Sequence, residues 1–200
     1  MTRRLHTQFD VPGYYHVYNR GAGKRTIFED AQDKAKFIAL MARYLDDKTY
    51  IRGDGVPYEK SEVKLLAYCL MGNHFHLFLY QDIETTDIQL FIKSLSSSYA
   101  RYYNLKYRKS GYLFEGQFKA KQITSDTYFD HITRYIHLNP RTYKTYKWSS
   151  LPEYTGGRVT PWVHTTLASQ MSPEKYMQFI ESYENRAKEL RKLKEVYDLQ

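Results

Sequence analysis

Two histidines stand one residue apart, His74 and His76, in the apolar and aromatic run GNHFHLFL. In a β-strand, residues i and i+2 point to the same face, so both imidazoles would project together while Phe75 points to the opposite face. Two neighbouring imidazoles can chelate a divalent metal ion, given a third ligand from elsewhere in the chain. The same spacing also fits two hydrogen-bonded or surface histidines, and spacing alone leaves both interpretations open.

A second group of polar side chains lies in the segment DHITRYIHLNP, residues 130–140. Residues four apart share one face of a helix, so Tyr135 and Asn139 would lie one above the other, with His131 one turn earlier. A tyrosine beside a metal ion can attack a phosphate that the ion polarises. The alternative is ordinary: a tyrosine at the edge of the core and an asparagine that ends a helix.

The elements that must position these residues follow from the hydrophobic pattern. β-Forming residues at 13–20 predict a strand, and the apolar runs 63–70 and 74–80, separated by Met71-Gly72-Asn73, predict a hairpin. Three- and four-residue apolar spacing predicts helices at 26–44, from Ile88 to Lys106, and up to Asn139, where Pro140 ends the helix. Partial alternation predicts another strand at 112–124. This order indicates an α+β, ferredoxin-like fold with an antiparallel sheet and helices on one face.

A C-terminal helical extension is expected after this domain. We place the main domain at residues 1–155 and the extension at 156–200, with a long helix at about 173–199. Apolar residues there repeat at alternating steps of four and three, from Tyr176 to Tyr197. This heptad pattern would pack on the protein's own domain or on a partner helix, so either a monomer or a homodimer is consistent with it.

The charge balance favours a polyanionic partner. Thirty Lys and Arg against 22 Asp and Glu give a net charge of +8, and the chain has 21 tyrosines. Basic side chains position a nucleic-acid backbone, and aromatic rings stack on unpaired bases. The basic residues that we expect to contact nucleic acid are Arg20, Lys24, Arg25, Arg101, Lys106, Arg108, Lys109, Lys119 and Lys121.

Several protein classes are disfavoured by the composition. No apolar run approaches the ~18 residues of a membrane span, and the N-terminus has no apolar segment typical of a secretory signal. The lone Cys69 excludes an internal disulfide and a cysteine-based zinc site. We therefore expect a cytoplasmic protein with no membrane partner.

Three ordered motifs resemble the single-tyrosine HUH endonucleases, which include insertion-sequence transposases and their REP-associated relatives. The motifs are GNHFHLFL, GYLFEGQFKA and RYIHLNP, and the opening YHVYNRG is similar to the family's first strand. The resemblance covers about residues 10–155. GYLFEGQF, with the WSS at 148–150, is closer to the REP-associated branch than to the shorter insertion-sequence enzymes. Gln117 departs from the arginine usual there, which affects a phosphate or base contact and leaves the cleavage chemistry intact.

The resemblance implies a metal-dependent reaction on single-stranded DNA with imperfect hairpins. His74, His76 and Asn139 would hold Mg²⁺ or Mn²⁺, and Tyr135 would attack the phosphate, giving a 5′-phosphotyrosine and a free 3′-OH that can later rejoin strands. His131, water or the bound phosphate could take part in proton transfer.

Three other functions remain open from the sequence. A non-catalytic module that binds single-stranded DNA or RNA would share the basic charge and the aromatic residues. A phosphoesterase for small nucleotides would use a metal-bound water and would not need Tyr135. A domesticated relative would keep the site but serve repeat maintenance or regulation.

Overall fold

The computed structural model describes residues 9–125 and 128–182. The strands and helices are, in chain order, β1 (Gly13–Arg20), α1 (Ala31–Leu45), β2 (Lys64–Leu70), β3 (His74–Gln81), α2 (Asp87–Tyr107), β4 (Lys119–Gln122), α3 (Phe129–His137), α4 (Leu151–Tyr154) and α5 (Pro173–Glu181). Short 3₁₀ helices occur at Ala22–Lys24 (η1), Tyr143–Thr145 (η3) and Thr165–Leu167 (η4). The predicted order of strands and helices is confirmed as far as α3.

The four strands form one open antiparallel sheet in the order β2-β3-β1-β4. The predicted hairpin is present, since residues 71–73 connect β2 to its neighbour β3. β1 lies between β3 and β4, which places Tyr18 directly opposite His76 and Arg20 opposite His74. The end of β1 therefore meets the start of β3, where both candidate metal-binding histidines lie.

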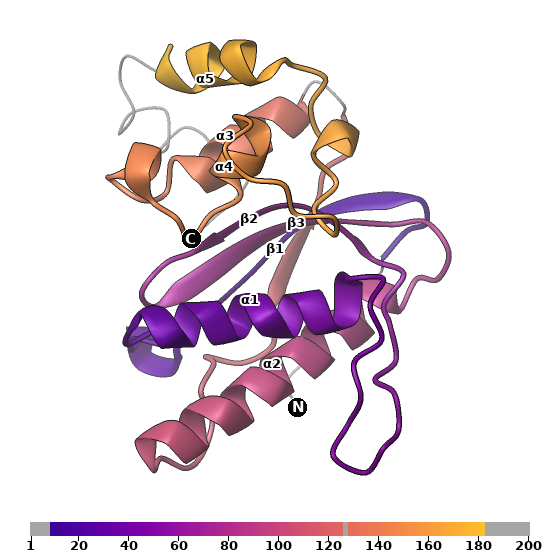
Figure 1. Ribbon diagram of the computed structural model, residues 1–200, viewed down its shortest axis with the longest axis vertical. Coiled ribbons are helices and arrows are strands. Elements are labelled where there is room, and N and C mark those ends of the chain that lie inside the picture. Colours follow the sequence, from indigo (N-terminus) through magenta and orange to yellow (C-terminus); the bar gives the residue numbers. More distant parts are fainter. Residues whose placement is uncertain (1–8, 126–127, 183–200) are drawn as a thin grey trace, which may run out of the picture.

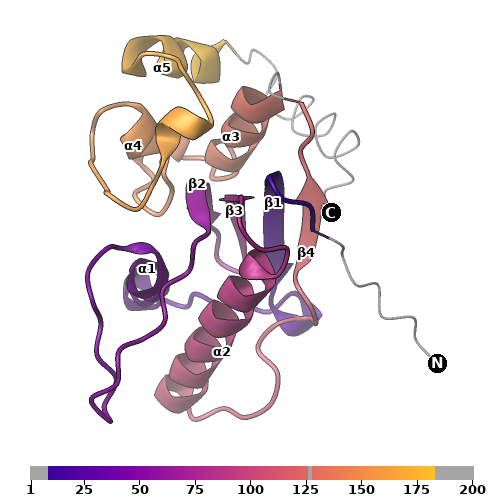
Figure 2. The ribbon, with the colours of Figure 1, turned by 90° about the vertical axis from the view of Figure 1, so that its right-hand side faces the viewer.

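Helices cover both faces of the sheet (Figures 1 and 2). α1 and α2 pack on one face around Phe37, Phe75 and Tyr99. α3, α4 and α5 lie on the other face, where Phe78 and Ile132 share a second core. The predicted α+β class with an antiparallel sheet is confirmed. The expectation that helices cover one face only was wrong, because a second helical layer covers the other face. The reason lies in the central hairpin: β2 is buried at six of its seven positions, so both of its faces need a cover.

α1 begins later than the hydrophobic spacing predicted. The Asp30 carboxylate accepts a hydrogen bond from the Asp33 amide at 2.9 Å, and the Asp33 carboxylate accepts one from the Asp30 amide, which forms a capping box. Upstream, the amides of Ile27 and Phe28 both donate to the carbonyl of Gly72. Those two residues therefore attach the chain to the β2–β3 turn and do not extend the helix.

The strand predicted at 112–124 is shorter than expected. The strand itself, β4, spans Lys119–Gln122, although the amides of Glu115 and Ile123 also donate to carbonyls of β1. Gly116 has a φ of 148°, a conformation that L side chains rarely adopt, and its carbonyl accepts a hydrogen bond from the Asn19 side chain. The segment before β4 therefore loops past the end of β1, with Phe114 buried against the α1 and α2 side of the sheet.

The described part of the C-terminal extension packs on the rest of the protein. Ser172 caps α5 by accepting a hydrogen bond from the Lys175 amide, and Tyr176 and Ile180 enter the same core as α3. This agrees with a heptad face that covers its own domain. The heptad positions from residue 183 onward, and most of the helix expected at 173–199, lie outside the described residues. Within the described ranges, no helix has the length and apolar character that crossing a membrane requires.

Candidate active site

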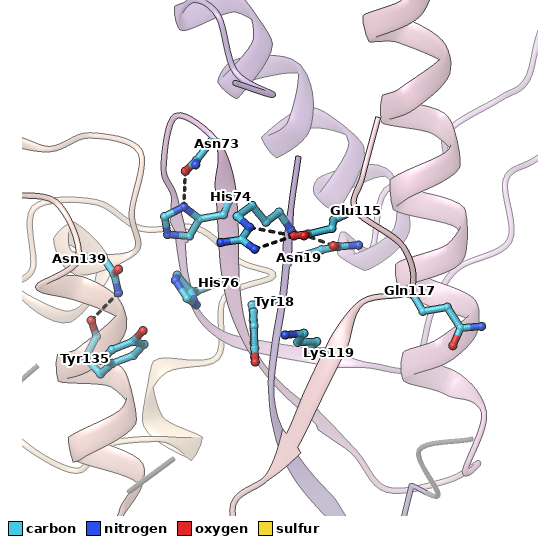
Figure 3. Close-up of a pocket in the computed structure, with 11 residues that line it drawn as sticks. Tyr18, Asn19, Asn73, His74, His76, Glu115, Gln117, Lys119, Tyr135 and Asn139 are labelled. Carbon is cyan, nitrogen blue, oxygen red and sulfur yellow. Dashed lines mark hydrogen bonds and ion pairs between the residues drawn. The ribbon is translucent and has the colours of Figure 1, made fainter. Parts of the chain in front are cut away.

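A cavity of about 450 Å³ opens where β1 and β3 end beside α3. Figure 3 shows the polar side chains of these elements around it. The residues that line it are Tyr18, Asn19, Arg20, Asn73, His74, His76, Glu115, Gln117, Lys119, Tyr135 and Asn139. His74, His76, Tyr135 and Asn139, which the sequence singled out from two segments 60 residues apart, are thus brought to one cavity.

His74 and His76 lie on the same face of β3, as the strand period predicted. Their ring centroids are 5.0 Å apart with the ring planes nearly perpendicular, at 88°. Phe75 between them is fully buried on the opposite face, under α1. Nδ1 of His74 is hydrogen-bonded to Oδ1 of Asn73 at 2.7 Å. Asn73 belongs to the hairpin turn, so local chain geometry orients the first imidazole.

His76 has a histidine as its neighbour, His16 of β1, which the sequence analysis did not single out. His16 Nε2 lies 3.0 Å from His76 Nδ1, and the two rings stack with centroids 5.1 Å apart at an angle of 14°. Burial, with the nearby charge of Lys121, lowers the pKa of His16 to about 3, so the ring is neutral at physiological pH. Its Nδ1 is buried and has no hydrogen-bond partner among the described residues.

Tyr135 reaches the cavity from α3. Its side chain is only 1% exposed, and its ring lies 5.5 Å from that of His76 and 5.8 Å from that of His16, edge to face in both cases. Burial raises the pKa of Tyr135 to about 12, with the Asn139 side chain acting in the opposite direction. The phenol is therefore protonated at neutral pH, and any reaction at its oxygen must remove that proton.

Asn139 follows α3 by two residues and lies across the cavity from the histidines (Figure 3). Its Nδ2 donates to the backbone carbonyl of Tyr135 at 2.9 Å, as expected for residues four apart on one helical turn. Because that bond uses the amide nitrogen, the amide oxygen is the atom that can face a cation.

These side chains form a mixed nitrogen and oxygen donor set. Among the described residues, no three or more His, Cys, Asp or Glu side chains group as a metal site, so the third donor here is an amide oxygen. Two imidazoles with one amide oxygen fit a divalent ion such as Mn²⁺ or Mg²⁺ that completes its coordination with phosphate and water. The residues present therefore fit the expected metal.

His131 is not brought to the cavity. Its Nδ1 lies 2.9 Å from Nη2 of Arg134, and its ring packs at 5.9 Å from Phe179, near α5. The helical period puts His131 on the same face of α3 as Tyr135. His131 lies one turn earlier, however, where α3 packs against Phe179 of α5. The expectation that His131 transfers a proton at Tyr135 therefore has no geometric support.

Two of the predicted basic contacts line the cavity itself. Arg20 forms an ion pair with Glu115 at 2.8 Å, and Lys119 lies over the ring of Tyr18. Gln117 also lines the cavity, well away from the histidines in Figure 3. Lys121 lies on β4 opposite His16 in the strand register. This end of the sheet therefore carries positive side chains beside the candidate site.

The remaining basic residues divide into exposed and paired groups. Lys24, Arg101 and Arg108 are exposed, and Arg25 donates from Nε to the carbonyl of Leu113. Lys109 lies over the rings of Tyr103 and Tyr107.

Lys106 was expected to contact nucleic acid at the surface, but its ammonium is paired with two carboxylates of the protein. Its ammonium is 2.8 Å from the Asp30 carboxylate and 2.7 Å from that of fully buried Asp33. Burial alone would raise the pKa of Asp33, but hydrogen bonds from Lys106, Tyr107 and the Glu29 amide together lower it. Lys106 therefore neutralises a buried carboxylate at the start of α1, and its charge is already used within the fold.

Known proteins give an independent comparison. The family model described as "Transposase IS200 like" matches residues 57–139, a range that contains His74, His76, Tyr135 and Asn139. The solved structure of a REP-associated tyrosine transposase bound to a REP hairpin is similar, with a TM-score of 0.56 and 12% identity, over 86% of this chain and 98% of that one. A protein from Deinococcus radiodurans R1 named as a transposase matches with a TM-score of 0.40 and 16% identity, over 68% and 95% of the two chains.

No curated protein matches the chain significantly. The family match and the shared fold agree with the motifs in the sequence. The resemblance is thereby confirmed: residues 57–139 match the model of the IS200-like transposase family, and the fold is similar to that of a REP-associated tyrosine transposase.

Proposed function

We propose that this protein cuts and rejoins single-stranded DNA beside imperfect hairpins, with Tyr135 as the nucleophile. The observation that carries the proposal is the convergence of Tyr135 and Asn139 from α3 with His74 and His76 from β3 on one cavity. A phosphoesterase that used only a metal-bound water would have no need for a tyrosine ring 5.5 Å from the ring of His76.

His74, His76 and Asn139 are the residues that would hold Mg²⁺ or Mn²⁺. When bound, such an ion polarises a phosphate and offsets the negative charge that develops as it reacts. His74, His76 and Asn139 line the same cavity as Tyr135, so a phosphate bound at these residues would lie beside the Tyr135 side chain.

The reaction begins at the Tyr135 hydroxyl. Its oxygen attacks the phosphorus in line, forming the Tyr–O–P bond, and the bond from phosphorus to the 3′ oxygen breaks. The phenol proton ends on the departing 3′ oxygen, so the products are a 5′-phosphotyrosine and a 3′-OH. Attack by another 3′-OH reverses these bond changes and joins strands without ATP. Because burial raises the pKa of Tyr135 to about 12, the phenol proton must be removed before or during the attack.

DNA binding would use the basic side chains around the cavity and on α2. Arg20, Lys24, Arg25 and Lys119 lie near the end of β1 or line the cavity. Arg101 is exposed on α2, and Arg108 is exposed directly after that helix. Such contacts position the phosphate backbone without reading its sequence. A hairpin partner is supported by the similar REP-associated transposase, whose structure contains a REP hairpin.

The test is a covalent adduct on a denaturing gel. Hairpin DNA labelled 3′ of the cleavage point, in its single-stranded flank, is incubated with protein and Mn²⁺ or EDTA. The proposal predicts a labelled protein band that requires Mn²⁺ and is lost in Tyr135→Phe. Tyr112→Phe is the matched control, because Tyr112 is 90% exposed and does not line the cavity.

Other outcomes point to other functions. Cleavage that survives in Tyr135→Phe would identify a nuclease that uses water. Tight hairpin binding, with neither cleavage nor adduct over a panel of hairpin sequences, would indicate a non-catalytic module for single-stranded nucleic acid.

A further inference from the structure

Each of the two cavity histidines has a polar partner on the same ring nitrogen. Nδ1 of His74 meets Oδ1 of Asn73 at 2.7 Å, and Nδ1 of His76 meets Nε2 of His16 at 3.0 Å. The two partners come from different parts of the chain, one from the hairpin turn and one from the middle of β1. In both histidines Nε2 is consequently the atom that can ligate an ion in the cavity.

Asn73 is fixed so that its oxygen faces His74. Its Nδ2 donates to the carbonyl of Lys24 at 3.2 Å, and its own carbonyl accepts a hydrogen bond from the Gly21 amide at 2.9 Å. With the amide nitrogen used in this way, Oδ1 acts as the acceptor. His74 must then donate from Nδ1, which puts its proton on Nδ1 and a lone pair on Nε2.

His16 is placed to do the same for His76. It is fully buried, its ring is nearly parallel to that of His76, and Tyr18 stacks beside it at 5.3 Å. A hydrogen bond between two neutral imidazoles needs one donor and one acceptor. When His16 Nε2 accepts, His76 carries its proton on Nδ1 and presents a lone pair at Nε2. The opposite arrangement puts a proton on His76 Nε2 and prevents it from binding a metal ion.

We propose that His16 and Asn73 are positioning residues that hold His76 and His74 with Nε2 toward the cavity, in the tautomer that binds a divalent ion. This inference rests on the proposed function, since it concerns the metal site of that reaction. Partners of this kind fix both the tautomer and the ring orientation of a metal-binding histidine, and losing one typically weakens metal binding 10- to 100-fold. A buried ring that merely filled space would have no such effect.

The test measures metal affinity and tautomer directly. Mn²⁺ dissociation constants are determined by electron paramagnetic resonance for the full chain and its variants. His16→Phe keeps a ring but removes the acceptor, and it should weaken Mn²⁺ binding about 10-fold or more. His16→Gln supplies an amide oxygen and should recover most of that loss. Asn73→Leu should weaken binding, and Asn73→Asp, which keeps an acceptor, should not.

Two further measurements separate positioning from folding. Long-range ¹H–¹⁵N spectra of the Mg²⁺-loaded protein should show His74 and His76 protonated on Nδ1, with His76 changing to a mixture of tautomers in His16→Phe. His164→Phe is the matched control: it removes a half-buried histidine that does not line the cavity and should leave Mn²⁺ affinity unchanged. If His16→Phe fails to fold, His16→Gln and the two Asn73 variants carry the test.

The results distinguish this inference from the proposed function. If His74→Ala loses Mn²⁺ while His16→Phe and Asn73→Leu bind it as tightly as the wild type, the metal site stands and the positioning role is wrong. If His74→Ala and the wild type bind Mn²⁺ equally, the metal site itself is wrong, and the positioning role is overturned with it.

Discussion

Two histidines, His137 and His16, are completely buried, and they differ in how fully their ring nitrogens are hydrogen-bonded. His137 at the end of α3 is hydrogen-bonded at both ring nitrogens, to the Tyr176 hydroxyl at 2.8 Å and the Ser150 hydroxyl at 2.7 Å. His16 is bonded at one nitrogen to His76, and its Nδ1 has no hydrogen-bond partner among the described residues. Burial lowers the pKa of each to about 3, so charge does not distinguish them.

The difference distinguishes contacts that join helices to the sheet from contacts beside the cavity. Ser150 also accepts a hydrogen bond from the backbone amide of Tyr68, and Tyr176 donates to Thr133. His137 therefore joins α3 to β2, to the residue that precedes α4 and to α5. This network fixes the helix that carries Tyr135 from the side away from the cavity, whereas the ring of His16 contacts Tyr18, His76 and Tyr135, which line the cavity. The bonding of His137 thus accounts for its place in the fold, and the contacts of His16 agree with the positioning role proposed for it.

The largest effect should be the loss of strand cleavage when Tyr135, on the cavity side of α3, is changed. Tyr135→Phe removes the oxygen that would form the covalent bond, and we expect strand cleavage to fall on the order of a thousand-fold or more. The free energy of unfolding of this variant should differ from that of the wild type by less than about 1 kcal/mol, because the aromatic ring and its packing are retained. Adduct formation and urea unfolding measure the two quantities. A variant that lost activity only in proportion to lost folded protein would contradict this assignment.

The next largest effect should be a loss of stability when the hydrogen bonds of His137 to Tyr176 and Ser150 are removed. His137→Phe leaves the buried hydroxyls of Ser150 and Tyr176 each without one partner, and we expect about 2–4 kcal/mol of lost stability. For a protein of this size the melting temperature falls by about 2–4 °C for each kcal/mol. His164→Phe again serves as the control. Equal stability of His137→Phe and wild type would remove the distinction between the two buried histidines.

The same substitution at His16 should have a smaller effect on stability. Phenylalanine keeps the stacked ring and removes a buried nitrogen that has no partner, at the expense of one hydrogen bond to His76. These changes oppose each other, so the free energy of unfolding should change by about 1 kcal/mol or less. Urea unfolding of the two His→Phe variants side by side checks this. A loss at His16 as large as that at His137 would make His16 a structural residue.

The sequence predicted those parts of the site that depend on local periodicity. The strand period put His74 and His76 on one face, and the helical period put Tyr135 one turn before Asn139. Neither period could find His16, because its contact with His76 depends on the register between β1 and β3. An alternating polar signal, Tyr14-His16-Tyr18, is present in β1, but it has meaning only once the neighbouring strand is known.

The same limit explains the other differences between prediction and structure. Lys106 appeared as one more basic residue on a helix, because Asp30 and Asp33 lie more than 70 positions away in the chain. His131 matched the helical face of Tyr135, but contacts with Arg134 and Phe179 took it away from the cavity. The second helical layer depends on the burial of both faces of β2, which a single strand's sequence indicates only weakly.

The smallest predicted effect, on the salt dependence of DNA binding, extends the comparison to two cations at the end of α2. Lys106 is paired with carboxylates within the fold, and Arg108, which directly follows the helix, is exposed. Arg108 is exposed, so Arg108→Met should remove about one phosphate contact and reduce the slope of log K against log salt by about 0.7 for single-stranded DNA. Lys106→Met should leave that slope unchanged but lower the stability, because Asp33 is then buried without its cation. Fluorescence anisotropy over a salt series, with thermal unfolding of both variants, measures the two effects. Equal losses of slope would show that Lys106 exchanges its carboxylates for phosphate when DNA binds, and that the ion pair is not a fixed part of the fold.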